Sequence, residues 1–247
     1  GHLVVDISQG ALPAILPFLR EAFHLSYAAA GTIILAANLT SSIIQPLFGN
    51  LADRTARRWL LPLSAFVSGL GIALTGVAPS YAAVVVLAVV SGLGIAAYHP
   101  EGYKSASHVA GDRKATGLSI FAIGGNLGMA LGPPMITVLV AGFGLRGSLW
   151  MVAPGLAVAA LLTAAMPALY SESSERESAV TAADGRRTMV GAMALLILVV
   201  TLRSWTQLGF TTYIPFFYID LLGADPRVVG SLLFVFLGAG AVGTLIG

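Results

Sequence analysis

Two uncharged apolar segments, joined by a short charged loop, most constrain how this chain can fold. Residues 28–48 and 59–81 contain no charged side chain. An α-helix of about 20 residues crosses the hydrocarbon core of a bilayer, so we expect each segment to span a membrane. The joining loop then lies at a membrane face, and it contains an acid and three arginines: Asp53, Arg54, Arg57 and Arg58.

The composition supports a membrane protein and argues against other classes. Hydrophobic residues make up 57% of the chain and charged residues only 10%, which is too little charge for the surface of an ordinary soluble domain. The formal net charge is only +2 and the basic residues lie in separate loops, so we predict no nucleic-acid partner. The absence of cysteine excludes disulfides and thiol chemistry.

About eight apolar segments have the length and composition of membrane-spanning helices. They are residues 1–18, 28–48, 59–78, 81–103, 115–140, 148–169, 189–217 and 228–247. The connection at 170–187 is rich in Ser, Glu and Arg and has no apolar periodicity. We therefore predict a flexible linker there, between a bundle at 1–169 and the helices at 188–247.

The charged loop also carries a motif. From Gly49 to Arg58 the spacing is G-x-L-A-D-R-x-x-R-R, and it resembles the loop between the second and third helices of the major facilitator superfamily of transporters. The resemblance implies that Gly49 lets helix ends approach, that Asp53 locks one bundle against the other in one conformational state, and that the arginines hold the loop in the cytoplasm. The alternative is a basic loop that only sets the orientation of the chain.

The orientation follows from the distribution of Lys and Arg between alternate loops. Nine of them fall on the side of the charged loop and three on the opposite side. Positively charged loops stay in the cytoplasm. The charged loop and the linker are therefore both predicted to be cytoplasmic.

The chain also repeats itself at an offset of 198 residues, which pairs Gln9 with Gln207, Pro17 with Pro215, and Gly49 with Gly247. Two halves related by a parallel repeat are expected of this superfamily. The repeat predicts that about eight of twelve helices are present, with helix 1 truncated and about four terminal helices missing.

Three further segments narrow the resemblance. Residues 6–13 (DISQGALP), 98–102 (YHPEG) and 124–133 (GGNLGMALGP) are similar to the fosmidomycin-resistance family of bacterial exporters. This resemblance implies proton-driven efflux of a small molecule, which is a phosphonate antibiotic for the named member. We expect a multi-pass monomer in the bacterial inner (cytoplasmic) membrane, with lipid, protons and a small-molecule substrate as partners and with no cofactor or metal.

A glycine series is predicted to set the packing of the fifth helix. Gly124, Gly128 and Gly132 are four residues apart, so they share one helix face and let a neighbouring backbone approach. Pro133 then removes a helix hydrogen bond and permits a bend. The series resembles the antiporter motif G-x-x-x-G-P, and the alternative is plain tight packing.

Several polar residues in the spans are candidate proton sites. Ala88 stands where the antiporter helix-4 motif has an arginine, so another group must carry protons. Asp6 is the first candidate, because a carboxylate inside a span is costly and marks function, unless it lies at a helix end. Gln9 shares its helix face. His99 and Glu101 could pass a proton or gate the inner side, although a lone histidine can also be structural.

Arg203 is the main candidate for substrate binding. A guanidinium within a span must find a partner, and it can grip a phosphonate or carboxylate with two hydrogen bonds. The alternative is a structural salt bridge from Arg203 to Asp6 across the two halves. Gln207 and Asn126 would add amide groups to the same cavity.

The sequence therefore predicts an all-α major facilitator fold with two bundles that rock around a midplane cavity. Its predicted function is proton-coupled efflux, with a facilitator or importer of a small organic anion as the alternative. A receptor that does not transport would share these features. We do not expect an enzyme, because there is no G-x-S-G or H-E-x-x-H motif and we expect that the four histidines do not cluster as metal ligands.

Overall fold

The computed structural model describes residues 1–54, 59–171 and 190–246, and every regular element in these ranges is helical. The α-helices are α1 (His2–Phe23), α2 (Tyr27–Arg54), α3 (Leu60–Thr75), α4 (Tyr81–Val109), α5 (Lys114–Phe143), α6 (Val152–Ser171), α7 (Val190–Phe216) and α8 (Val228–Ile246). Short 3₁₀ turns precede α5 (Gly111–Arg113) and α6 (Leu145–Met151), and a π-helical turn follows α7 (Phe217–Leu221).

All eight predicted spans are helices. Six of the described helices are long and apolar enough to cross a bilayer, and the two others, α3 and α8, are apolar but shorter. A backbone inside lipid must satisfy its hydrogen bonds within the segment itself. For this reason, uninterrupted apolar runs of this length could be assigned as helices from sequence. The largest differences are at α2 and α4, which continue to Arg54 and Val109, each six residues past the predicted end.

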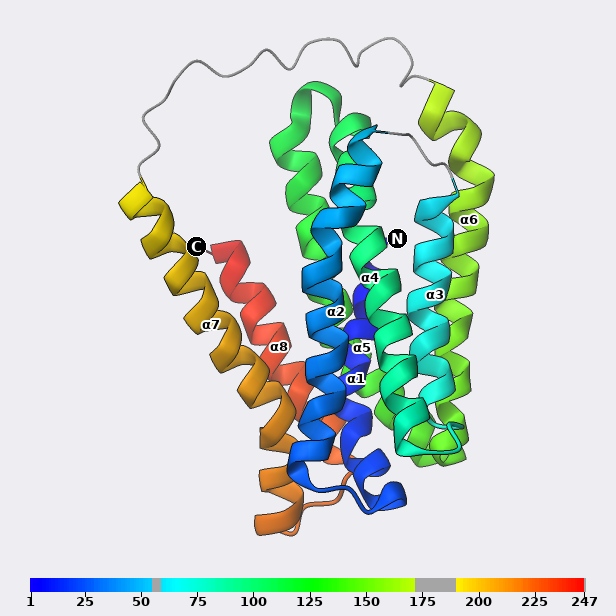
Figure 1. The fold of residues 1–247 in the computed structure, drawn as a ribbon, viewed down its shortest axis with the longest axis vertical. Coiled ribbons are helices and arrows are strands. Elements are labelled where there is room, and N and C mark those ends of the chain that lie inside the picture. Colours follow the sequence, from blue (N-terminus) through cyan, green and yellow to red (C-terminus); the bar gives the residue numbers. More distant parts are fainter. Residues whose placement is uncertain (55–58, 172–189, 247) are drawn as a thin grey trace.

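Helix α1 lies in the centre of the molecule (Figure 1), and more of its span is buried than in any of the other five long spans. It packs on α5, while α2 and α3 pack on α4, and α6 packs on α3. The central contacts are aliphatic: Ile15, Leu16 and Leu19 of α1 are fully buried in a cluster with Ile33 of α2 and Ile136 of α5. The polar residues Asp6 and Ser8 of α1 are likewise buried, enclosed by neighbouring helices.

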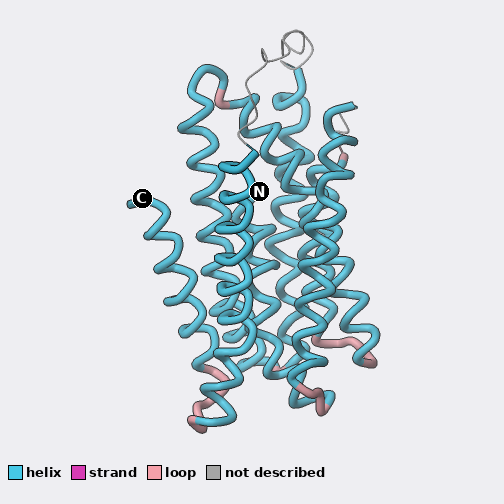
Figure 2. The backbone as a smooth tube through the Cα atoms, turned by 60° about the vertical axis from the view of Figure 1, so that its left-hand side comes forward, coloured by secondary structure: helices cyan, strands magenta, loops and turns pink. Residues whose placement is uncertain are grey.

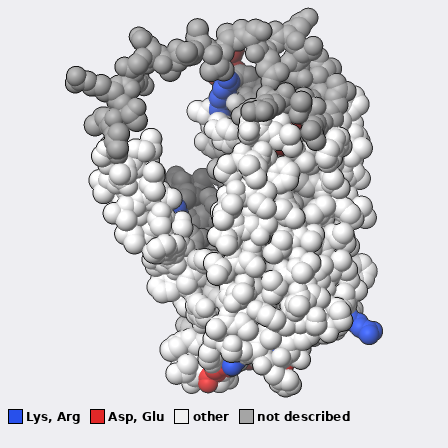
Figure 3. Space-filling model, in the orientation of Figure 1, with Lys and Arg blue, Asp and Glu red and all other residues white. Residues whose placement is uncertain are grey.

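Helices α7 and α8 contact the rest of the chain mainly at the end opposite the linker. Gly230, at the start of α8, packs so closely on α5 that a Cβ atom there would lie 2.9 Å from Pro134 and Thr137. Towards the linker end, α8 leans away from α1–α6 in both views (Figures 1 and 2). The space-filling view shows a hollow between the two parts on that side (Figure 3). Since the linker is predicted to be cytoplasmic, the structure opens towards the predicted cytoplasmic side.

Helices α1 and α5 approach each other through glycine. A Cβ atom on Gly128 would overlap the Leu3 carbonyl group, one on Gly132 would overlap the Ile7 carbonyl, and one on Gly10 would overlap the Met129 carbonyl. These are backbone atoms, which cannot rotate away. The four-residue spacing of the helix-5 glycines predicts such an approach, and its role as an antiporter motif stays a prediction.

We expect Gly128→Ala to lower the stability of the α1–α5 contact, because the added methyl group overlaps backbone that has no room to move. Overpacking of this kind costs about 1–3 kcal/mol. The measurement is the midpoint of thermal unfolding of the intact transporter in detergent. Gly142→Ala on the same helix is the matched control, because nothing lies within 4 Å of a Cβ atom there. Equal midpoints for the two variants would contradict the packing role.

Candidate functional site

Asp6 is buried inside a membrane-spanning helix. Its exposed fraction is 6%, and it lies on α1 between the first turn and the tightly packed middle of the helix. The N-terminus of the chain lies within the molecule, short of the linker-side ends of α2, α4 and α5 (Figure 1). This position argues against the alternative that Asp6 lies at a membrane face.

Two imidazole rings flank the Asp6 carboxylate. His2, four residues earlier on α1, places its Nε2 atom 3.2 Å from Asp6 Oδ2. His99, on α4, places its Nε2 atom 3.2 Å from Asp6 Oδ1. The Oδ1 atom is buried and has no hydrogen-bond partner among the described residues, so its contact with His99 is an ion pair when that ring is protonated. We call His2, Asp6 and His99 the Asp6 cluster.

The backbone fixes the orientation of both rings. The Nδ1 atom of His2 lies 2.6 Å from the carbonyl oxygen of Phe121 on α5. The Nδ1 atom of His99 lies 2.9 Å from the carbonyl oxygen of Ile95, one turn earlier on α4. A carbonyl oxygen can only accept, so both Nδ1 atoms must donate. Each ring is therefore held with its Nε2 atom facing Asp6.

Aromatic and glycine neighbours pack closely against the cluster. The His2 ring stacks on Phe121 with centroids 3.9 Å apart and meets His99 edge-on at 5.0 Å. On α5, a Cβ atom at Gly125 would lie 2.7 Å from Asp6 Oδ2 and even closer to the His2 ring. The second glycine of the Gly124–Gly125 pair thus makes space for the cluster, a role that the four-residue glycine pattern does not reveal.

The structure brings together Asp6 and His99, two residues singled out from the sequence, and adds His2, to which the sequence analysis gave no role. The signal that could have found His2 is its spacing, because residues four apart on a helix lie on the same face. The bridge from Asp6 to Arg203 is absent from the described residues, where the ion-pair partners of Asp6 are the two histidines. Arg203 is exposed on α7.

The other candidates are dispersed around the cluster. Glu101 is buried on α4, where a two-residue spacing directs it away from the face of His99. Gln9 on α1, Asn126 on α5 and Gln207 on α7 are each half-buried. The structure therefore does not gather all the sequence candidates into one site.

The charged loop lies largely outside the described residues. Gly49 is half-buried near the end of α2, and a Cβ atom there would lie 3.9 Å from Pro100 on α4. The side chains of Asp53 and Arg54, and the whole of residues 55–58 with Arg57 and Arg58, fall outside the described part. The roles of these residues in locking and orientation stay predictions.

The expectation that the histidines do not cluster is wrong for two of the four. One ligand atom each from His2, Asp6 and His99 lie within 4.8 Å of one another, because the fold joins residues that are far apart in sequence. Two imidazoles and a carboxylate are a donor set that transition metals use. Here, however, the two rings contact different oxygens of the carboxylate.

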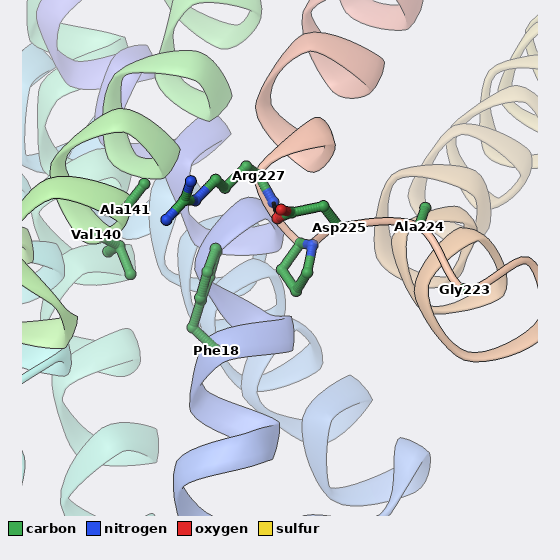
Figure 4. A pocket seen from close by; sticks show the side chains of 8 residues that line it. Phe18, Val140, Ala141, Gly223, Ala224, Asp225 and Arg227 are labelled. Atoms are coloured by element: carbon green, nitrogen blue, oxygen red, sulfur yellow. Dashed lines mark hydrogen bonds between the residues drawn. The ribbon is translucent and has the colours of Figure 1, made fainter.

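A second feature lies at the opposite end of the molecule, where α1 and α5 meet the loop before α8. A recess of about 650 Å³ opens there, lined by Phe18, Val140, Ala141 and residues 223–227. The Arg227 side chain extends across it towards Val140 and Ala141 (Figure 4). This recess belongs to the contact between α8 and the rest of the chain and does not reach the Asp6 cluster.

Comparisons with known proteins agree with this architecture. The family model described as Major Facilitator Superfamily matches residues 1–247. The chain is 30% identical to the Fosmidomycin resistance protein of Escherichia coli (strain K12), in an alignment that covers 100% of this chain and 62% of that protein. It is 25% identical to the Probable sulfoacetate transporter SauU of Cupriavidus necator, with 100% of this chain and 61% of that protein covered.

Among solved structures, the chain resembles a bacterial homologue of the human lysosomal transporter Spinster, in an inward-facing and unoccupied conformation. The TM-score is 0.74 at 15% sequence identity, and the match covers 99% of this chain and 59% of that one. The likeness shows a shared fold. The chain thus spans about three fifths of the length of these relatives.

Proposed function

Because this chain belongs to the major facilitator superfamily, we propose that it is part of a transporter that exports a small molecule from the bacterial cytoplasm in exchange for protons bound at Asp6. Helices α1–α6 form one bundle of this transporter, and α7 and α8 begin the second. The two bundles rock around a site between them. The observation that carries the proposal is the burial of Asp6 between two imidazoles in a membrane-spanning helix.

The partners of Asp6 are side chains whose positive charge can be removed, and this supports a proton site. A buried carboxylate is stabilised by a cation, and a lysine or arginine would supply one permanently. Histidine instead changes its charge in the physiological range. A carboxylate that is paired with two histidines can therefore bind and release protons together with them. A purely structural ion pair would need no partner whose charge changes.

Arg203 supports an anionic substrate. It is exposed on α7. In the most apolar 18-residue stretch of Met193–Leu221, no residue is buried inside the structure. A guanidinium in a span binds oxyanions with paired hydrogen bonds. Two relatives bear names that refer to fosmidomycin resistance and to sulfoacetate, so a small phosphonate or a similar organic anion is the proposed substrate class.

A second candidate is a facilitator or importer of a small organic anion. The relative named as a probable sulfoacetate transporter favours it. It would share the fold and Arg203 with an exporter. The two functions differ in the direction of net flux under an imposed proton gradient, which transport by the intact protein in vesicles can measure.

We expect Asp6→Asn to abolish uphill transport while substrate exchange continues. The amide keeps the shape of the side chain but cannot gain or lose a proton. The measurement compares fosmidomycin accumulation driven by a pH gradient with exchange at equal pH, in vesicles of the intact transporter. We expect accumulation to fall at least about tenfold, which corresponds to about 1.4 kcal/mol. Undiminished accumulation by the variant would refute Asp6 as the proton site.

Arg203→Ala should weaken substrate binding itself. Loss of a hydrogen bond to a charged group costs about 1.5–3 kcal/mol, or roughly ten- to hundredfold in Kd. Binding of fosmidomycin to the purified transporter is measured by calorimetry. Arg146→Ala is the control, because Arg146 is also exposed but lies in the 3₁₀ turn before α6. If the Arg203 variant and the control bind equally, Arg203 is not a substrate ligand.

A further inference from the structure

We propose that His2, Asp6 and His99 bind protons as one unit, which holds two exchangeable protons when it is full. His2 is then a proton-binding residue together with Asp6 and His99. The use of these protons in transport rests on the proposed function. Their joint binding follows from the geometry of the cluster alone.

The proton count follows from the fixed rings. Both Nδ1 atoms carry a hydrogen that is donated to a backbone carbonyl, so these two hydrogens do not exchange with the carboxylate. Each Nε2 atom lies 3.2 Å from a different oxygen of Asp6. A nitrogen and an oxygen that both present lone pairs repel at this distance, so a proton held by either group favours each contact. The two contacts are thus both favourable when the cluster holds two protons.

The charge of the cluster changes with each proton. The full cluster carries a net charge of +1, whether both rings are imidazolium beside a carboxylate or one ring is imidazolium beside a carboxylic acid. Loss of one proton leaves the cluster neutral with one contact of facing lone pairs. Loss of both leaves a bare carboxylate and two repelling nitrogens, so the three side chains must separate.

Among the described residues, the ion-pair partners of Asp6 are the two histidines. Helix α1 contributes His2, and α4 contributes His99 and the buried Tyr98, whose ring lies 6.4 Å from each histidine ring. Glu101 is buried further along α4. Helix α5 contributes Phe121 and Gly125, which do not titrate. The charge of Asp6 is thus balanced by protons on its two histidines, and the α1–α4 contact made by Asp6 and His99 depends on them.

The test counts protons in the intact transporter. Proton uptake per protein is measured by potentiometric titration in detergent, with Asp6→Asn as the reference that removes the shared carboxylate. We expect His2→Gln and His99→Gln each to bind one proton fewer than the unaltered protein. His24→Asn is the matched control, because His24 is exposed and has a left-handed backbone that asparagine tolerates.

The outcomes separate this inference from the proposed function. Joint binding is refuted if the titration curve of His2→Gln differs from that of the control only by the loss of one histidine, so that Asp6 and His99 titrate as before. Proton coupling still stands in that case if proton-driven accumulation is normal. If the cluster titrates jointly but transport needs no proton gradient, the coupling is refuted and joint binding stands. Nitrogen NMR of the rings gives the same decision should His2→Gln unfold, since jointly held protons shift both Nε2 signals together.

An independent set of contacts leads to a second inference. We infer that Arg20, Tyr27 and Asp220 form a latch that holds the molecule closed at the end opposite the linker. Arg20 Nη1 donates to Asp220 Oδ2 at 2.8 Å, and the Tyr27 hydroxyl donates to the same oxygen at 2.7 Å. Arg20 lies in the last turn of α1 and Tyr27 begins α2, whereas Asp220 lies in the π-helical turn after α7.

The latch is well formed but solvent-accessible, which suits a contact that must break. The Arg20 guanidinium lies 4.3 Å from the centroid of the Tyr27 ring and 5.5 Å from that of Phe216. The side chains of Arg20 and Asp220 are 29% and 26% exposed, and partly exposed ion pairs contribute little to stability. The pair therefore biases the closed state without fixing it.

Spin labels can test the latch in the intact transporter. Labels at Ala22→Cys and Leu222→Cys, both exposed positions in a stretch without cysteine, report the separation across the latch. We expect Asp220→Asn to raise the ratio of long to short distances up to about fivefold, and the exchanged pair Arg20→Asp with Asp220→Arg to restore the short one. Asp225→Asn in the next loop is the control. An unchanged distribution in Asp220→Asn refutes the latch, whether or not protons drive transport.

Discussion

The buried carboxylate of Asp6 is the constraint on which the arrangement around α1 depends. A charge at this depth in a membrane is costly unless partners surround it. Its direct partners are His2 on α1 and His99 on α4. Helix α5 takes part through the carbonyl oxygen of Phe121, which accepts a hydrogen bond from His2. Helices α1, α4 and α5 must therefore pack closely enough around Asp6 for these groups to reach one another.

Glycine makes that proximity possible. At Gly128 and Gly132 the backbones of α1 and α5 touch without intervening side chains, and Gly125 leaves the space that the His2 ring and the carboxylate occupy. In a membrane, close packing of small residues replaces the hydrophobic effect as the force that joins helices. The same glycines thus hold the bundle together and position the Asp6 cluster.

The two ends of the molecule differ in how they are held. At the linker end, α8 leans away from the first six helices (Figures 1 and 2). At the other end, close contact at Gly230 combines with the exposed group of Arg20, Tyr27 and Asp220. The contact of α8 with α5 at Gly230 is tight, whereas the polar contacts of α1 and α2 with the turn after α7 are exposed and contribute little to stability.

The class of this protein and the approximate position of each described α-helix could be predicted from the sequence alone, because the length and apolarity that a membrane requires are local properties of a segment. The sequence also marked Asp6 and His99, since a titratable group inside an apolar run is conspicuous. Only the tertiary structure decided that His2 joins them and that Arg203 does not pair with Asp6. Residues 6 and 99 meet through the packing of α1 against α4, and which faces of helices meet depends on the fit of side chains across the whole bundle, which no local pattern specifies.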